Sequence, residues 1–137
     1  EDAGVMLNTD GSASVDIPAG INGSYYLTVK HRNSISAVSA NPVSFASGVT
    51  TYAFDAAEKA FGNNLLETAD GYFVIFGGDV DQDGAVDTGD MTPVDNDASL
   101  FRTGYLNTDC DGNGSVDTGD MTIVDNNSAM FISVITP

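Results

Sequence analysis

Side-chain oxygens at regular spacing give this chain its clearest candidate for chemistry. Two stretches, 79–90 and 109–120, each begin with carboxylate or amide side chains at every second position. Oxygens spaced in this way can converge on one point when the chain curls around it. Oxygen donors without histidine or thiolate select a hard cation such as calcium over zinc or copper. The two stretches are therefore candidate sites for a divalent cation.

Both stretches belong to an internal repeat, in which 79–97 recurs as 109–127. Of the 19 aligned positions, 13 are identical, and the order of many different residue types is kept. Two copies are too few for a solenoid, which needs three or more units to bury a shared face. We therefore expect a closed pair of units related by a pseudo-two-fold axis.

Each stretch has the ligand spacing of a 12-residue EF-hand loop, with side chains at positions 1, 3, 5, 9 and 12 and a backbone carbonyl at position 7. Position 6 is Gly84 or Gly114, which permits a sharp turn. Position 8 is Val86 or Val116, where we expect the loops to pair with each other through a short β bridge. The sequence predicts two Ca²⁺ ions with these ligands: Asp79, Asp81, Asp83, Ala85, Asp87, Asp90, Asp109, Asp111, Asn113, Ser115, Asp117 and Asp120.

A short amphipathic helix is predicted after each loop. One face recurs at i, i+3, i+7 and i+10, and its members are Met91, Val94, Ala98 and Phe101, then Met121, Val124, Ser128 and Phe131. We expect this face to form a core, helix against helix. The stretch 72–76 before the first loop is typical of a strand, and the short segment 102–108 leaves no room for a helix before the second loop. Each unit is thus a loop and one helix.

This arrangement resembles the type I dockerin module of bacteria. The resemblance covers about residues 77–133 and rests on two D-x-D-x-D/N-G-x-V-D-x-x-D loops, the missing entering helix and the duplicated exit helix. It implies a small two-calcium α module that binds a cohesin on an extracellular scaffold. It also implies that loop positions 10 and 11 and the middle of each helix contact the partner. Those residues are Thr88, Gly89, Asp95, Asn96, Asp97, Thr118, Gly119, Asp125, Asn126 and Asn127.

The first half of the chain predicts a β domain. Short apolar or alternating runs between glycine- and asparagine-rich turns are typical of strands. They lie at 12–17, 24–32, 36–39, 43–45, 50–54 and 72–76, with one or two helical turns at 55–61. The pattern predicts an immunoglobulin- or transthyretin-like β-sandwich as one domain, 1–76, followed by the dockerin-like calcium-binding domain, 77–137.

The run 25–33 resembles a strand of β domains that directly precede dockerin-like tails in bacterial surface proteins. Those domains begin with further strands upstream, whereas only the short segment 1–11 precedes Ser12 here. The sandwich is therefore expected to lack an edge strand. An unpaired edge of this kind can accept a strand from another chain.

Composition excludes several functions. The 137 residues carry 20 acidic and four basic side chains, a net charge of −16, which leaves no basic face for nucleic acid. An apolar fraction of 42% permits a buried core, yet no run is long enough to span a membrane. His31 is the only histidine and is expected at the surface, and Cys110, the only cysteine, at a variable loop position. The D-T-G triplets at 87–89 and 117–119 match aspartic proteases, but their aspartates are already calcium ligands.

These observations predict no enzyme. They predict a secreted, extracellular or cell-surface structural protein of bacterial origin, which binds calcium and mediates protein–protein assembly with a cohesin-like partner. One alternative is a filament subunit that forms a homopolymer by β-strand exchange. A second alternative is a carbohydrate-binding accessory domain, with an aromatic platform of Tyr25, Tyr26, Tyr72 and Phe73. Strand alternation favours core packing for those aromatic side chains.

Overall fold

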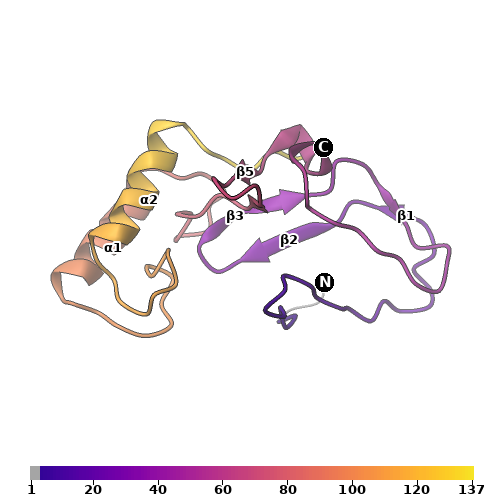
Figure 1. The fold of residues 1–137 in the computed structure, drawn as a ribbon, viewed down its shortest axis with the longest axis horizontal. Coiled ribbons are helices and arrows are strands. Elements are labelled where there is room, and N and C mark those ends of the chain that lie inside the picture. Colours follow the sequence, from indigo (N-terminus) through magenta and orange to yellow (C-terminus); the bar gives the residue numbers. More distant parts are fainter. Residues whose placement is uncertain (1–3) are drawn as a thin grey trace.

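Helices and strands occupy different ends of an elongated molecule (Figure 1). The computed structural model describes residues 4–137. Its first part contains β1 (Ser24–Tyr25), β2 (Thr28–His31), β3 (Ser34–Val38), β4 (Val43–Ser44), the 3₁₀ turns η1 (Ala57–Lys59) and η2 (Phe61–Asn63), β5 (Leu66–Glu67) and β6 (Phe73–Val74). Its second part contains α1 (Thr88–Ser99) and α2 (Thr118–Ala129). Within residues 4–137, no helix has the length and apolar character that a membrane crossing requires.

The described strands form three antiparallel sheets of two strands each: β1 with β4, β2 with β3, and β5 with β6. The β2–β3 hairpin is the longest, and its register places Thr28 opposite Val38 and His31 opposite Ser34, with a shift between Val29 and His31. The structure thus confirms small sheets in the first part and two helices in the second. The finer sandwich architecture stays a prediction.

Two of the expected strands are wrong. Residues 12–17 and 50–54 form no strand among the described residues. Both keep the alternating pattern, but a strand also needs a partner for its backbone groups, and the pattern does not supply one. The expected strand 24–32 is divided into β1 and β2, and the expected strand 72–76 is reduced to β6. β5, which has only two residues, was not predicted from the sequence.

The main core lies between the two helices and the two loops. Val86 and Val116 from the loops, and Val94 and Val124 from the helices, are at most 3% exposed. Met91, Ala98 and Met121 pack against this cluster. The helix-against-helix core is therefore confirmed. Ile35 of β3 is also fully buried in the same cluster, so the first half of the chain contributes to the core of the second.

The predicted core positions of Phe101 and Phe131 are wrong. Each lies just beyond the end of its helix, and they are 87% and 90% exposed, respectively. Their φ angles of 52° and 55° are left-handed, which ends the helix and turns each ring toward solvent. The helical spacing predicts which residues share a face only within the helix, and α1 and α2 end before these two residues.

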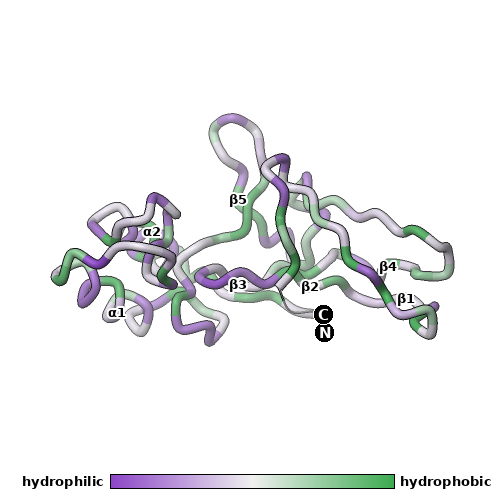
Figure 2. Tube along the Cα trace, turned by 90° about the horizontal axis from the view of Figure 1, so that it is seen from below, coloured by the Kyte–Doolittle hydropathy of each residue, from purple (hydrophilic) through white to green (hydrophobic). Residues whose placement is uncertain are grey.

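Hydrophobic residues lie at the strand end of the molecule, where green segments flank β1 and β4 (Figure 2), and several of their side chains are exposed. Tyr25, Tyr26 and Tyr72 are 46%, 40% and 70% exposed, so the expectation of core packing for these rings is wrong. The ring of Tyr25 lies 5.9 Å from that of Phe45. Phe54, Phe73 and Ile75 pack against a second, small core of Ala37, Ala60 and Leu65, so the core packing expected for Phe73 is confirmed.

Candidate metal centre

The first loop (79–90) and the second loop (109–120) each run directly into their helix. Asp87, at position 9, is the N-cap of α1, and its Oδ1 accepts the backbone N–H of Gly89 at 2.6 Å. Asp90, at position 12, accepts the backbone N–H of Asp87 at 2.9 Å and completes a capping box. Asp117 and Asp120 form the same box at α2. These carboxylates satisfy amide groups that the first helical turn leaves free, and they favour a helix start at position 10.

The carboxylates at position 12 also close the loops. Asp90 Oδ1 accepts the backbone N–H groups of Val80 at 2.7 Å and Asp81 at 3.2 Å. Asp120 Oδ1 accepts those of Cys110 at 2.6 Å and Asp111 at 3.1 Å. Both aspartates are at most 1% exposed. Burial raises the pKa of Asp90 above its usual value.

Glycines at two loop positions have identifiable roles. Gly84 and Gly114, at position 6, have φ angles of +94° and +88°, as the predicted sharp turn requires. Gly89, at position 11, has a different role, because an added Cβ would lie 3.0 Å from Asp87 Oδ1 and 3.2 Å from Asp81 Oδ2. Gly119 has the same surroundings at 3.1 and 3.3 Å from Asp117 and Asp111. These two glycines leave room for the carboxylates, a role that the sequence analysis missed although glycine stands there in both repeats.

The loops gather their leading carboxylates into two groups that could hold a metal ion. Asp79, Asp81 and Asp83 each place one oxygen within 4.8 Å of the others. In the second loop the corresponding acidic group consists of Asp109, Asp111 and Asp120. The remaining predicted side-chain ligands have other partners: Asp87 and Asp117 cap the helices, Asp90 closes the first loop, and Asn113 donates from Nδ2 to Asp111 Oδ2 at 2.9 Å.

Two orphaned oxygens show that these groups fit a cation. Asp79 and Asp109, at position 1 of each loop, are 2% and 3% exposed. In both, the buried Oδ1 has no hydrogen-bond partner among the described residues. A buried carboxylate oxygen without a partner is costly, and a cation among the neighbouring carboxylates would satisfy it. Burial and the neighbouring acids raise the pKa of Asp79, so the site disfavours its charged form unless a positive ion is present.

The predicted β bridge between the two loops is wrong. Each loop pairs with the segment that follows the helix of the other repeat, through the isolated bridges Ala85↔Ser133 and Thr103↔Ser115. The two bridges are equivalent, because Ala85 corresponds to Ser115 and Thr103 to Ser133 in the repeat, in keeping with the expected pseudo-two-fold relation. Val86 and Val116 are buried, as apolar side chains at position 8 should be, but they face the shared core.

The residues that the dockerin resemblance implied as partner contacts divide into two groups. Eight are exposed or half-buried, namely Thr88, Gly89, Asp95, Asn96, Thr118, Gly119, Asp125 and Asn126. Asp97 and Asn127 instead hold the fold together. Thr108 donates to Asp97 Oδ2 at 2.7 Å, and Asn127 Nδ2 donates to the carbonyl of Gly77 at 2.7 Å.

Cys110 and His31 are the two potentially reactive side chains that are not predicted calcium ligands, and burial shifts the pKa of both. Burial raises the pKa of the Cys110 thiol to about 12, which keeps it protonated at neutral pH. Burial also lowers the pKa of His31, whose Nδ1 lies 3.1 Å from the hydroxyl of Ser34. Ser34 is only 8% exposed, so this hydroxyl is shielded from solvent.

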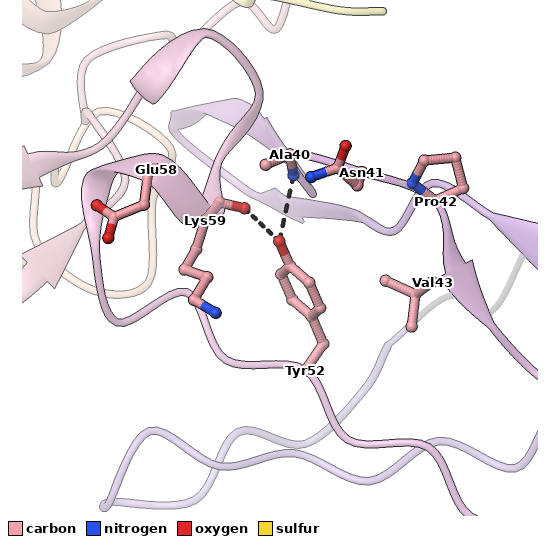
Figure 3. Close-up of a pocket in the computed structure, with 7 residues that line it drawn as sticks. All are labelled: Ala40, Asn41, Pro42, Val43, Tyr52, Glu58 and Lys59. Carbon is pink, nitrogen blue, oxygen red and sulfur yellow. Dashed lines mark hydrogen bonds between the residues drawn. The ribbon is translucent and has the colours of Figure 1, made fainter.

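A hollow of about 400 Å³ lies away from the loops, between the end of β3 and η1 (Figure 3). The hydroxyl of Tyr52 points to its wall, where it accepts the N–H of Ala40 at 3.2 Å and donates to the carbonyl of Lys59. Both interactions hold two backbone segments together. The Tyr52 hydroxyl therefore has a structural role. The charged residues that line the hollow are Glu58 and Lys59.

Comparison with protein-family models, with curated proteins and with solved structures found no match for this chain.

Proposed function

We propose that this chain is a non-catalytic, calcium-binding assembly module that binds one Ca²⁺ in each loop and functions outside a bacterial cell. The observation that carries this proposal is the pair of buried, unpartnered Oδ1 atoms of Asp79 and Asp109. They occupy the same position in two repeats, and in each repeat two further carboxylates have an oxygen within 4.8 Å of one of that aspartate's oxygens. One such atom could be an accident of packing, but two at equivalent positions support the same kind of ion in each loop.

Calcium suits this ligand set better than other common cations. The first loop supplies five carboxylates and the second supplies four. Calcium accepts six to eight oxygens in a flexible geometry, whereas magnesium requires a small octahedron and retains several waters. The loops contain no histidine and only one thiol, a ligand set that disfavours zinc and copper.

Bound calcium would stabilise the helical part of the chain. The acids of each loop repel one another, and two Ca²⁺ ions would reduce the formal charge from −16 to −12. At a free concentration of about 100 times the dissociation constant, each site adds about 2.7 kcal/mol. Millimolar calcium is an extracellular condition, which supports secretion or display on the cell surface.

A role in assembly is supported by the exposed faces of the repeats. The two loop–helix units are related by equivalent bridges and leave polar residues of both helices at the surface. This resembles the dockerin module, and a cohesin-like protein is the corresponding partner. The exposed rings of Phe101 and Phe131 add two equivalent apolar contacts beside these faces.

The experiment is isothermal titration of the chain with a type I cohesin domain, first in calcium-containing buffer and then in excess EDTA. We expect a complex in calcium that disappears in EDTA. The matched control is the variant Asp81→Ala/Asp111→Ala, which should show no complex in either buffer. Absence of a complex with the native chain in calcium would contradict the cohesin-like partner, while calcium titration of the chain alone tests the metal sites separately.

A second candidate function is a filament subunit that polymerises by strand exchange. The specific observation is the segment 13–17, which alternates Ala13, Val15 and Ile17 with polar residues and makes no hydrogen bond through its backbone to the described residues. Val15 and Ile17 are each 42% exposed. Because every described sheet has two strands, each also keeps an edge that an extended segment of another copy can join.

Light scattering coupled to size-exclusion chromatography tests this second candidate. We expect the native chain to form larger species as its concentration rises in calcium, and Val15→Asn/Ile17→Asn to remain a monomer. Val49→Asn is the control, since Val49 is 84% exposed but lies outside the segment. A native chain that stays monomeric at every concentration would contradict strand exchange.

A further inference from the structure

We propose that the turn between β2 and β3 completes the second calcium site, with Arg32 and Asn33 as positioning residues for Asp109. This inference rests on the proposed calcium binding. It begins with a difference between two otherwise similar loops. Position 4 is Gln82 in the first loop and Gly112 in the second, and both have left-handed backbones, with φ angles of 63° and 74°.

In the first loop, the side chain at position 4 holds the first ligand residue. Gln82 Nε2 donates to the backbone carbonyl of Asp79 at 2.6 Å. This bond fixes the chain at the start of the loop, next to the carboxylate whose Oδ1 is unpartnered. Gly112 has no side chain, so the second loop cannot make the corresponding bond to Asp109 from within.

The β2–β3 turn supplies the missing donors. Asn33 Nδ2 donates to the carbonyl of Asp109 at 2.8 Å, and Arg32 Nη2 donates to the same oxygen at 2.8 Å. Both donors belong to the first half of the chain, far in sequence from the loop that they hold. The carbonyl at position 1 is therefore held in both loops, from inside the first and from the hairpin in the second.

These donors are firmly held. Asn33 is 1% exposed, and its carbonyl accepts the N–H of Gly78 at 2.7 Å. Arg32 Nε donates to the carbonyl of Leu106 at 2.9 Å, and the guanidinium lies 4.1 Å from the centre of the Tyr105 ring. Their side chains are thus positioned before any ion binds, as residues that orient metal ligands generally are.

The charge of Arg32 also distinguishes the two sites. Its Nη2 lies 3.5 Å from Asp109 Oδ2, the one ion pair found among residues 4–137. The same Oδ2 accepts the backbone N–H of Gly114 at 3.2 Å, whereas the buried Oδ1 has no hydrogen-bond partner among the described residues. Within this carboxylate, one oxygen is held by the hairpin together with its own loop, and the other is available to a cation.

The hairpin turn consequently connects both loops to the first half of the chain. Ser34, next to Asn33, accepts Gln82 Nε2 through its carbonyl at 3.3 Å. Ile35 follows it into the core between the helices. Calcium in the second loop should therefore order the β2–β3 turn as well as α2.

Nuclear magnetic resonance of the full chain tests this inference site by site. The backbone amides of Gly84 and Gly114 report the two loops separately during a Ca²⁺ titration. We expect Asn33→Ala to weaken binding at the second loop at least tenfold and the first loop by no more than about fivefold, which is the effect expected from coupling between the sites. Gln82→Ala is the matched variant and should weaken the first loop instead.

Two further measurements keep the test decisive if Asn33→Ala folds poorly. In the native chain, the side-chain signals of Asn33 and Arg32 should shift with the same calcium midpoint as Gly114. In the double variant Asn33→Ala/Gly112→Gln, the new side chain should recover part of the affinity, because an added Cβ at Gly112 meets nothing within 4 Å and glutamine already adopts the equivalent left-handed backbone at Gln82, with a φ of 63°. Side-chain signals that ignore calcium, or a double variant as weak as Asn33→Ala, would contradict the inference.

The outcomes separate this inference from the calcium proposal. A native chain in which neither Gly84 nor Gly114 responds to calcium would overturn calcium binding itself. A native chain in which both respond, with Asn33→Ala weakening both loops equally or neither, would overturn only the role of the hairpin.

Discussion

The backbone N–H of Val86 donates to the carbonyl of Ile132 across 2.8 Å, which joins the first loop to the segment after α2. The second loop is joined to the segment after α1 by the equivalent bond from Val116 to Arg102, at 2.9 Å. Neither repeat therefore completes its own loop. An ion that orders one loop would therefore also order the segment that follows the other repeat's helix.

This exchange predicts coupling between the two calcium sites. Asp111→Ala should abolish binding at the second loop and also weaken the first by about fivefold, within the usual range of coupling between sites. Calorimetric titration with Ca²⁺ measures both effects. Asp16→Ala is the control, because this exposed acid lies outside both loops. An unchanged affinity at the first loop would show that the repeats bind independently.

The small space around Gly89, at position 11 of the first loop, predicts that adding a single methyl group there lowers calcium affinity. Gly89→Ala places a Cβ 3.0 Å from Asp87 Oδ1 and 3.2 Å from Asp81 Oδ2, which the carboxylates can relieve only by moving. We expect calcium affinity at the first loop to fall about tenfold, equivalent to about 1.4 kcal/mol. In the calcium-free chain the better helix propensity of alanine should offset part of the strain that the same contact places on the Asp87 cap.

The neighbouring variant Thr88→Ala is the control for this substitution, since Thr88 is exposed at the start of α1. It should leave calcium affinity unchanged in the same titration. Equal affinities for Gly89→Ala and the native chain would show that the carboxylates do not need this space.

The left-handed backbone at the helix ends predicts a stabilising substitution. Phe101 has a φ of 52° and is 87% exposed, so Phe101→Gly removes backbone strain and almost no packing. We expect urea unfolding in calcium to show a gain of about 0.5–1 kcal/mol. Leu100→Gly is the matched control, because Leu100 has a φ of −96° and should lose stability. A loss of stability in Phe101→Gly would indicate that its ring makes a contact within the fold.

Much of the candidate site could be predicted because its signals are local. The loop spacing located Asp79 and Asp109, and glycine at position 6 predicted the turn that Gly84 and Gly114 make. The helices begin within the predicted loops because the aspartates at positions 9 and 12 form capping boxes. Ligand spacing, turn and cap all lie within a single loop, where sequence order determines which groups meet.

The parts that failed depend on contacts between distant residues. No local pattern predicts that the backbone N–H of Val86 bonds to the carbonyl of Ile132 rather than to the other loop. Nor does a pattern show that Asn33 reaches Asp109, because the only sign in the sequence is the missing side chain at Gly112. The segment 12–17 has the alternation of a strand, but alternation cannot supply the partner that a strand requires.

The single histidine predicts a specific pH dependence. Burial, with a further contribution from Arg32, lowers the pKa of His31 below its usual 6.5. The unfolded chain then binds more protons than the folded chain between these two pKa values, so stability should fall as the pH drops below about 6.5. Urea unfolding in excess calcium at several pH values measures the fall, and His31→Gln should remove this part of it. A titration of the ring signal with a pKa at or above 6.5 would contradict the prediction.

Calcium titration of the native chain, followed by thermal unfolding with and without EDTA, tests the central claim most directly. We expect two Ca²⁺ ions per chain, and two sites at about 100 times their dissociation constants would add roughly 5 kcal/mol. The melting temperature should therefore fall by roughly 10 °C or more when EDTA removes the ions. A chain that gives no heat with Ca²⁺ and melts at the same temperature in EDTA would contradict the account.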